Sequence, residues 1–129
     1  MISIINDMER IGDICYQMSI EIERKNEKKI KFDQNLKKNI LELTNAVNDA
    51  LNVMQKNLQE NYNQVSISKA DELEISINKI RNKLRKKYLQ EIEKGSMEIT
   101  EGMIYINLVH SLEKIGDHIF NVSEAITGD

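Results

Sequence analysis

The sequence predicts an all-α fold, an antiparallel up-down four-helix bundle that forms a single domain over residues 1–129. Composition is the first reason. The chain has no proline, five glycines, 5% aromatic and 30% charged residues, which suits long helices and disfavours a sheet-rich fold. The second reason is that apolar residues recur at steps of three and four, as in helices with one buried face. The third is an internal repeat that opens and closes the chain.

The first expected helix runs from about Ile2 to Glu23. Its apolar stripe consists of Ile4, Met8, Ile11, Cys15, Met18 and Ile22. Cys15 is the one cysteine, so no disulfide can form, and we expect it in the core as a small apolar residue. No capping residue precedes the helix, and we therefore expect a domain excised from a longer membrane transporter chain. A short protein that starts at Met1 is the alternative.

The second and third expected helices follow a basic connection. Asp33 is expected to cap the second helix, whose seam consists of Leu36, Ile40, Leu43, Val47, Ala50, Met54 and Leu58. A loop at residues 61–64 then leads to residues 68–71, which resemble a capping box at the start of the third helix. That helix carries Leu73, Ile77, Ile80, Leu84 and Tyr88, and we expect it to stop at Gly95.

The fourth expected helix runs from about Met97 to Thr127 and repeats the first. Residues 112–117 read LEKIGD where residues 8–13 read MERIGD. The fourth helix has its own apolar stripe in the same register, Leu108, Leu112, Ile115, Ile119, Val122 and Ile126. We therefore expect the first and fourth helices to be antiparallel, related by approximate internal symmetry, with both stripes facing the core.

Each copy of the repeat carries two carboxylates away from its stripe. Glu9 and Asp13 stand four residues apart in the first copy, as do Glu113 and Asp117 in the second. Like charges at this spacing repel by roughly 0.2–0.5 kcal/mol, and the glycine inside each copy costs about 1 kcal/mol relative to alanine. Because both costs occur twice, we expect a cation or a partner at this face. A solvated carboxylate pair beside a packing glycine is the alternative.

These residues carry a family resemblance. The two hexapeptides, with residues 121–124, resemble the E(D)xxxD signature of PhoU proteins, the phosphate-uptake regulators, which are built from two three-helix repeats. The resemblance covers essentially the whole chain and implies the last helix of a first repeat followed by a complete second repeat. The sequence of residues 5–13 is most similar to the C-terminal cytosolic region of bacterial sodium/phosphate cotransporters.

The resemblance also implies a metal site, because PhoU relatives pair this motif with an acidic motif on the preceding helix. The implied ligands are Glu113, Asp117, Glu74 and Asn78. Asn78 departs from the family pattern, since an amide is neutral and a weaker ligand, so we expect weak binding that purification can remove. An all-oxygen set suits a hard cation such as magnesium, calcium, manganese or iron. Glu9 and Asp13 would form a second, incomplete metal site.

Other features of the sequence favour ordinary explanations. His110 and His118 are minor candidates for added ligands, since a lone histidine is more often a surface or core residue. The basic run over residues 79–87 is expected to be a solvated helix face, with anionic lipid or an acidic transporter surface as the alternative. The net charge of −3 gives no reason to expect nucleic acid. No apolar run reaches the ~18 residues of a membrane span.

The sequence therefore predicts a regulatory module and no enzyme, since no catalytic triad or phosphate-binding loop is present. The resemblance implies the cytosolic tail of a sodium-dependent phosphate cotransporter, on the cytoplasmic side of the inner (cell) membrane. Its partners are the transporter's membrane domain or, in a homodimer, a second copy. The alternatives are a free-standing PhoU-type regulator and a structural dimerisation bundle without metal. A ferritin-like bundle is disfavoured because Glu-x-x-His motifs are missing.

Overall fold

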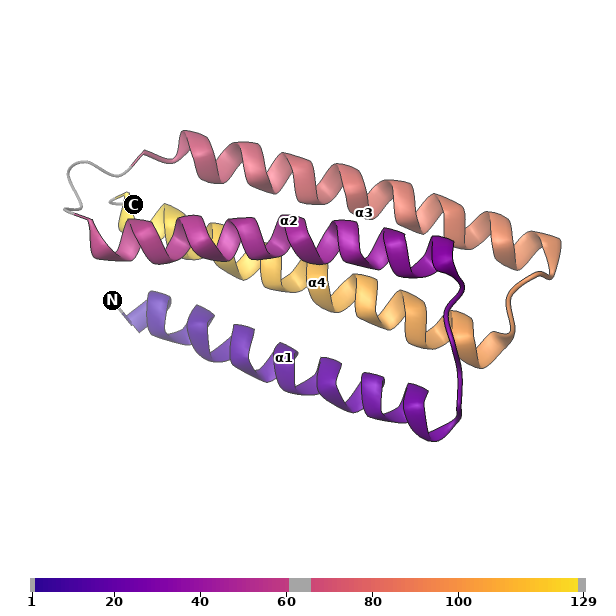
Figure 1. Cartoon of the computed structure of the whole chain (residues 1–129). Helices are drawn as coiled ribbons and strands as arrows, with labels where there is room; N and C mark the ends of the chain where they lie inside the picture. Colours follow the sequence, from indigo (N-terminus) through magenta and orange to yellow (C-terminus); the bar gives the residue numbers. More distant parts are fainter. Residues whose placement is uncertain (1, 61–65, 128–129) are drawn as a thin grey trace.

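The computed structural model describes residues 2–60 and 66–127, which fold into four long helices (Figure 1). These helices are α1 (Ile2–Glu27), α2 (Gln34–Gln59), α3 (Ser68–Lys94) and α4 (Ile99–Ile126). Consecutive helices run in opposite directions along the molecule, which confirms the all-α, up-down bundle (Figure 1). The loop expected at residues 61–64 lies outside the described residues.

Local sequence signals set most helix ends. Asp33 caps α2 as expected, with its Oδ1 accepting a hydrogen bond from the Leu36 N–H at 2.8 Å. Gly95 ends α3 in the left-handed conformation, at φ 67°. The capping box expected for α3 is not formed. Ile67 occupies the N-cap position without a side-chain bond, while Ser66 Oγ accepts from the Ser68 N–H at 3.2 Å.

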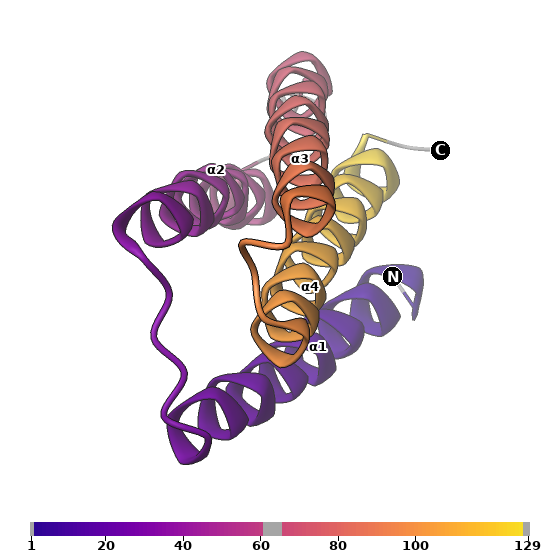
Figure 2. The ribbon, with the colours of Figure 1, turned by 90° about the vertical axis from the view of Figure 1, so that its right-hand side faces the viewer.

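Helix α4 lies at the centre of the packing. It contacts α1, α2 and α3, and α2 and α3 also contact each other. Helix α1 packs against α4 but makes at most weak contact with α2 and α3. Seen along the bundle, α2, α3 and α4 cluster together while α1 diverges from α2 (Figure 2). The bundle is therefore a three-helix unit with α1 laid on the outer side of α4.

The apolar stripe expected on α4 is confirmed, because all six of its residues are buried. The seam of α2 is also internal, with Leu43 and Val47 at its most buried part. In α3, Ile77 and Leu84 are buried, and the rest of its expected seam, Leu73, Ile80 and Tyr88, is partly buried. These three faces meet in one continuous apolar core, whose burial is the main stabilising term of such a domain.

The stripe expected on α1 is only partly buried. Ile4 and Ile11 are in the core, but Met8, Cys15 and Ile22 are exposed, so the expectation that this whole stripe faces the core is wrong. Ile14, which was not assigned to the stripe, is buried instead. The physical reason is that α1 has one close neighbour and can bury only the narrow face that α4 covers. Within residues 2–60 and 66–127, no helix combines the length and apolarity that a membrane crossing requires.

Candidate functional site

The motif on α4 faces α3, and its glycine is a packing position. Gly116 is buried, and a Cβ added there would lie 3.3 Å from two side-chain atoms of Ile77. The missing side chain therefore lets Ile77 sit directly on the α4 backbone. This contact explains why the sequence accepts the cost of a glycine in the middle of α4.

Glu113 is met by arginine side chains of α3. It forms an ion pair with Arg81, and its Oε1 lies 3.9 Å from Nη2 of Arg85. The side chains of Glu113 and Arg81 are 16% and 20% exposed, so this pair is largely withdrawn from water. The expectation of a fully solvated basic run is therefore wrong at Arg81. Sequence reasoning missed the pair because its partners lie on different helices.

A second group of polar side chains lies between α3 and α4. Asn78 Nδ2 donates to Glu74 Oε1 at 3.5 Å, while Glu74 Oε2 is buried and has no hydrogen-bond partner. Burial raises the pKa of Glu74, and the negative charges of Asp117 and Glu124 raise this pKa further. The structure thus places Glu74 near Asn78 and Asp117, and it pairs Glu113 with arginine.

This grouping determines how far the residues present fit a metal ion. Two carboxylates with one amide can offer oxygen ligands to a hard cation, and one oxygen of Glu74 is buried without a hydrogen-bond partner. Across the part of the chain that the structure describes, no three His, Cys, Asp or Glu side chains are arranged as a metal site. A metal site on Glu74, Asn78, Glu113 and Asp117 therefore stays a prediction.

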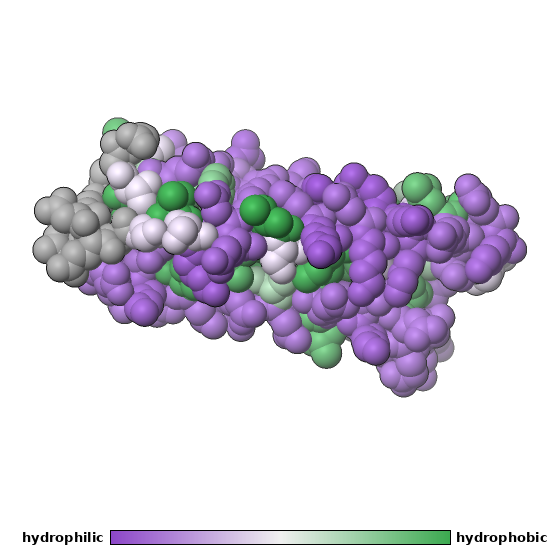
Figure 3. All heavy atoms as spheres, turned by 90° about the horizontal axis from the view of Figure 1, so that it is seen from above, coloured by the Kyte–Doolittle hydropathy of each residue, from purple (hydrophilic) through white to green (hydrophobic). Residues whose placement is uncertain are grey.

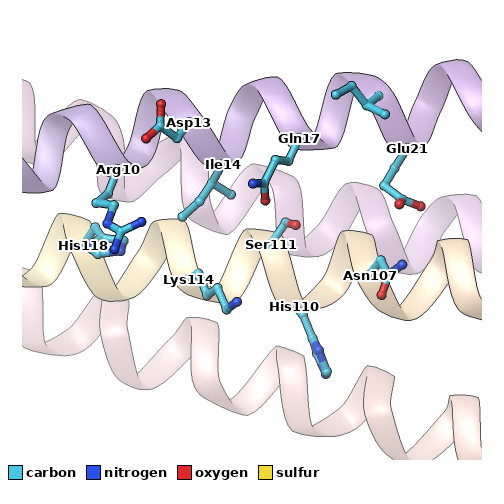
Figure 4. Close-up of a pocket in the computed structure, with 11 residues that line it drawn as sticks. Arg10, Asp13, Ile14, Gln17, Glu21, Asn107, His110, Ser111, Lys114 and His118 are labelled. Atoms are coloured by element: carbon cyan, nitrogen blue, oxygen red, sulfur yellow. The ribbon is translucent and has the colours of Figure 1, made fainter.

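The motif on α1 has no such neighbours. Glu9 and Asp13 are exposed, and Asp13 lines the groove between α1 and α4 (Figure 4). Gly12 is also exposed, and a Cβ added there would meet nothing within 4 Å. We call the surface around this glycine the open face of α1, and it consists of Ile5, Met8, Glu9, Gly12, Cys15 and Tyr16. Glu9 and Asp13 as a metal half-site stay a prediction.

The two histidines lie along the junction of α1 and α4, where a groove of about 760 Å³ separates the helices (Figure 4). His118 Nδ1 lies 2.8 Å from Asp7 Oδ1 and links the two helices. His110 Nε2 lies 3.3 Å from Nη2 of Arg85. Burial lowers the pKa of His110, and the nearby positive charges of Arg85, Lys114 and Arg81 lower it further. Neither histidine joins the group around Glu74.

Comparisons with known proteins agree with this arrangement of helices. The model of the PhoU domain matches residues 40–126, which include α3, α4 and most of α2. Over 126 residues, the chain is 26% identical to the phosphate-specific transport system accessory protein PhoU homolog 1 of Thermotoga maritima. The alignment covers 94% of this chain and 51% of the relative, so the chain spans about half of that protein's length. No solved structure matches the chain.

The family match includes every residue that the structure places at the α3–α4 junction, from the ion pair of Glu113 to the close packing at Gly116. It covers well over half of the sequence. The alignment with the relative extends the similarity to almost the whole chain. The chain belongs to the PhoU domain family.

Proposed function

We propose that this chain regulates phosphate transport through contacts with other proteins, as the cytosolic tail of a sodium-dependent phosphate cotransporter. The regulatory role is supported by the match of the PhoU domain family and by a relative named as an accessory protein of phosphate-specific transport. The assignment of this chain as a transporter tail is supported by the sequence of residues 5–13, which resembles the C-terminal regions of such cotransporters. The family match is the observation on which the proposal mainly rests.

Regulation by such a module is a matter of differential binding. A bundle that catalyses nothing can change a transporter only by binding one of its conformations better than another. The α3 side of the molecule is mostly hydrophilic, with apolar residues in small groups (Figure 3). The larger exposed apolar residues gather instead on α1, which makes its open face the best candidate for such a contact.

In this proposal, the membrane domain of the same polypeptide is the partner, on the cytoplasmic side of the cell membrane. A flexible tether gives the linked domain a local concentration on the order of millimolar. Contacts too weak to detect between separate molecules would then suffice for regulation.

A free-standing PhoU-type regulator is the second candidate. The observation in its favour is that the relative, named as an accessory protein, aligns with 94% of this chain, including α1. Such a regulator would act on a separate phosphate importer. A homodimer or a structural bundle without metal remains the outcome if no transport effect is found.

A hard cation at the α3–α4 junction is part of the proposal. Glu74, Asp117 and Asn78 would hold it, and when bound it would offset the repulsion between the two carboxylates. Glu113 takes no part, since Arg81 already compensates its charge. The neutral amide of Asn78 makes the site weak, so that magnesium, calcium, manganese or iron would exchange readily.

Deletion of this region tests the proposal. The full-length gene, with and without the codons for residues 1–129, is expressed in cells that lack their own phosphate importers, and sodium-driven phosphate uptake is measured. We expect uptake to persist after deletion, with at least a twofold change in its rate or in its dependence on external phosphate. Immunoblotting of the membrane domain controls for the amount of transporter.

Uptake that is unchanged in both rate and phosphate dependence would contradict a regulatory tail. If the gene supports no sodium-driven uptake by itself, but its product changes uptake through a separate importer, the free-standing regulator is correct. The point variant Leu112→Asp serves as a second control, because it disrupts the fold without shortening the chain.

A further inference from the structure

A polar pocket of about 350 Å³ lies at the end of the bundle where α2 and α4 begin and α3 ends. These three helix ends lie at the same end of the molecule (Figure 1). Most of the side chains that line the pocket are polar or charged, and its volume suits a small organic molecule. It shares no lining residue with the groove between α1 and α4.

Two polar side chains are buried at this pocket. Asn39 lines it and is 7% exposed, while Tyr105 is 0% exposed, with Phe32 and Tyr88 packed on its ring at centroid distances of 5.9 and 6.2 Å. Burial raises the pKa of Tyr105 to about 12, and Asn39 and Asp33 also act on this pKa, so the hydroxyl lies beside residues of the lining. Within residues 2–60 and 66–127, this hydroxyl has no hydrogen-bond partner. A ligand that reorganises these groups into hydrogen bonds would therefore be favoured.

The charges around the pocket are mostly negative. Three carboxylates line it, those of Asp33, Glu91 and Glu101. Among the described residues of the lining, Lys87 is the one lysine or arginine. Burial raises the pKa of Glu101, and the negative charges of Asp33 and Glu98 raise this pKa further. A bound cation would offset this repulsion.

Helix capping explains only part of this arrangement. Asp33 caps α2, Glu98 caps α4, and Glu101 lies in the first turn of α4. Carboxylates at these positions interact favourably with the helix dipole. Capping does not require the amide of Asn39 and the hydroxyl of Tyr105 to be buried beside the same carboxylates. The pocket therefore holds polar groups beyond those that the helix ends use.

A metal ion suits this pocket less well than an organic cation. Nowhere in the described part of the chain are three His, Cys, Asp or Glu side chains arranged as a metal site. An ammonium group donates up to three hydrogen bonds, and the carbon chain attached to it can occupy a volume of this size.

We propose that this pocket binds a small organic cation that carries a primary ammonium group. The ammonium donates to the carboxylates of Asp33 and Glu101 and to the amide oxygen of Asn39. Tyr105 is a positioning residue, because its hydroxyl donates to the second lone pair of the same amide oxygen. Lys87 competes with the ligand for the carboxylates. The inference goes beyond the proposed role in transport and holds for a tail or for a free-standing regulator alike.

The experiment titrates 1,4-diaminobutane into the intact, nitrogen-15-labelled chain at constant ionic strength. Binding is followed by NMR through the side-chain amide signals of Asn39. We expect a saturable shift of these signals. The uncharged probe 1,4-butanediol, of similar length, should give no saturable shift at the same concentrations, and magnesium chloride should not displace the diamine.

Matched charge variants make the test specific. Glu101→Gln should weaken binding at least about tenfold, because it removes a charged acceptor. Its control, Glu93→Gln, changes an exposed carboxylate of α3 outside the pocket and should bind within about twofold of the parent chain. Lys87→Gln should bind at least about threefold more tightly, whereas Lys86→Gln, its exposed neighbour, should bind like the parent.

Tyr105→Phe separates a lost site from a lost fold. It removes a hydroxyl that has no partner in the described residues and keeps the ring that Phe32 and Tyr88 contact. The melting temperature of the free variant should therefore equal or exceed that of the parent. Binding of the diamine should weaken at least about fivefold, since the amide of Asn39 is no longer positioned.

Several outcomes would overturn the proposal. The first is an absence of saturable binding up to about 10 mM diamine. The second is equal weakening by Glu101→Gln and Glu93→Gln, because the diamine would then respond only to the overall charge. The third is an equal shift with the uncharged diol, and the fourth is displacement by magnesium, which would indicate a metal site. Unchanged binding by Tyr105→Phe would contradict the role given to its hydroxyl.

Discussion

Helices α1 and α4 carry the same motif in different surroundings. Helix α4 contacts the three other helices. Ile77 packs on its motif glycine, and Arg81 forms an ion pair with its motif glutamate. Helix α1 has α4 as its one close neighbour, and its glycine and glutamate face outward. On α4, the motif therefore serves the contact with α3. Its glycine permits close approach, and its glutamate accepts a positive charge.

The two helices also show that an apolar helix face is not always buried. Apolar spacing marks the same stripe on both helices, yet Leu112 is buried and Met8 is exposed. A hydrophobic pattern reports which face is able to pack. The number of neighbours then decides how much of that face is removed from water.

The largest expected difference concerns the apolar stripe. Leu112→Asp should unfold the protein or cost more than about 4 kcal/mol, since it places a carboxylate without a partner in the core. Met8→Asp, the equivalent change on α1, should alter the free energy of unfolding by about 0.5 kcal/mol or less. Urea denaturation of both variants measures this. Similar losses in the two would mean that α1 is as enclosed as α4.

The next difference concerns the motif glutamates. Arg81→Ala leaves Glu113 without its partner in a largely buried position and should destabilise the fold by about 2 kcal/mol. Glu9→Gln should have no measurable effect, because Glu9 is exposed. Thermal unfolding at neutral pH compares the two. A melting temperature of Arg81→Ala equal to that of the parent protein would contradict this prediction, since the ion pair would then contribute nothing to stability.

The glycines should respond with opposite signs. Gly116→Leu forces Ile77 off the α4 backbone and should cost about 1–3 kcal/mol by overpacking. Gly12→Leu replaces a glycine in an exposed helix interior and should stabilise the chain by about 1 kcal/mol. Chemical denaturation gives both values. Loss of stability in both variants would show that a side chain at position 12 clashes with neighbouring atoms.

The pKa of Glu74 should give a smaller, pH-dependent effect. A carboxyl group with a raised pKa in the folded state holds its proton more tightly there than in the unfolded state. As the pH rises above about 4.5, the group loses this proton at a greater cost in the folded state, so the fold becomes less stable. Glu74→Gln should therefore be more stable than the parent at pH 7, and this advantage should vanish below pH 4.5. Melting curves from pH 4 to pH 8 test the sign. An advantage that persists at low pH would point to packing instead.

The smallest expected effect is metal binding. Titration of manganese into the chain by calorimetry should give weak heat that is lost in the double variant Glu74→Gln/Asp117→Asn. Glu9→Gln/Asp13→Asn should leave this heat unchanged, because the two carboxylates of α1 lack a partner helix here. Heat that survives in both double variants, or no heat at all, would reject the site.

Two helix ends were predictable from the sequence, whereas the capping box expected at the start of α3 is not formed and contacts between helices were harder to predict. The cap at Asp33 and the stop at Gly95 depend on neighbours in the chain, and both are confirmed. The grouping of Glu74 with Asp117 came from the family resemblance and agrees with the structure. The pair of Arg81 with Glu113 was missed, because the spacing of charges along one helix says nothing about the helix opposite.

The most direct test compares the solvent accessibility of equivalent positions on α1 and α4 by maleimide labelling. Cys15 of α1 is exposed, and Ile119, its counterpart on α4, is buried. Maleimide labelling is measured on the parent chain and on the double variant Cys15→Ala/Ile119→Cys, under identical native conditions. We predict that Cys15 reacts at nearly the rate of a thiol in an unfolded peptide, and that the cysteine at position 119 reacts at least roughly a hundredfold more slowly, since it must wait for local opening. Equal rates, or a protected Cys15, would contradict the difference between α1 and α4.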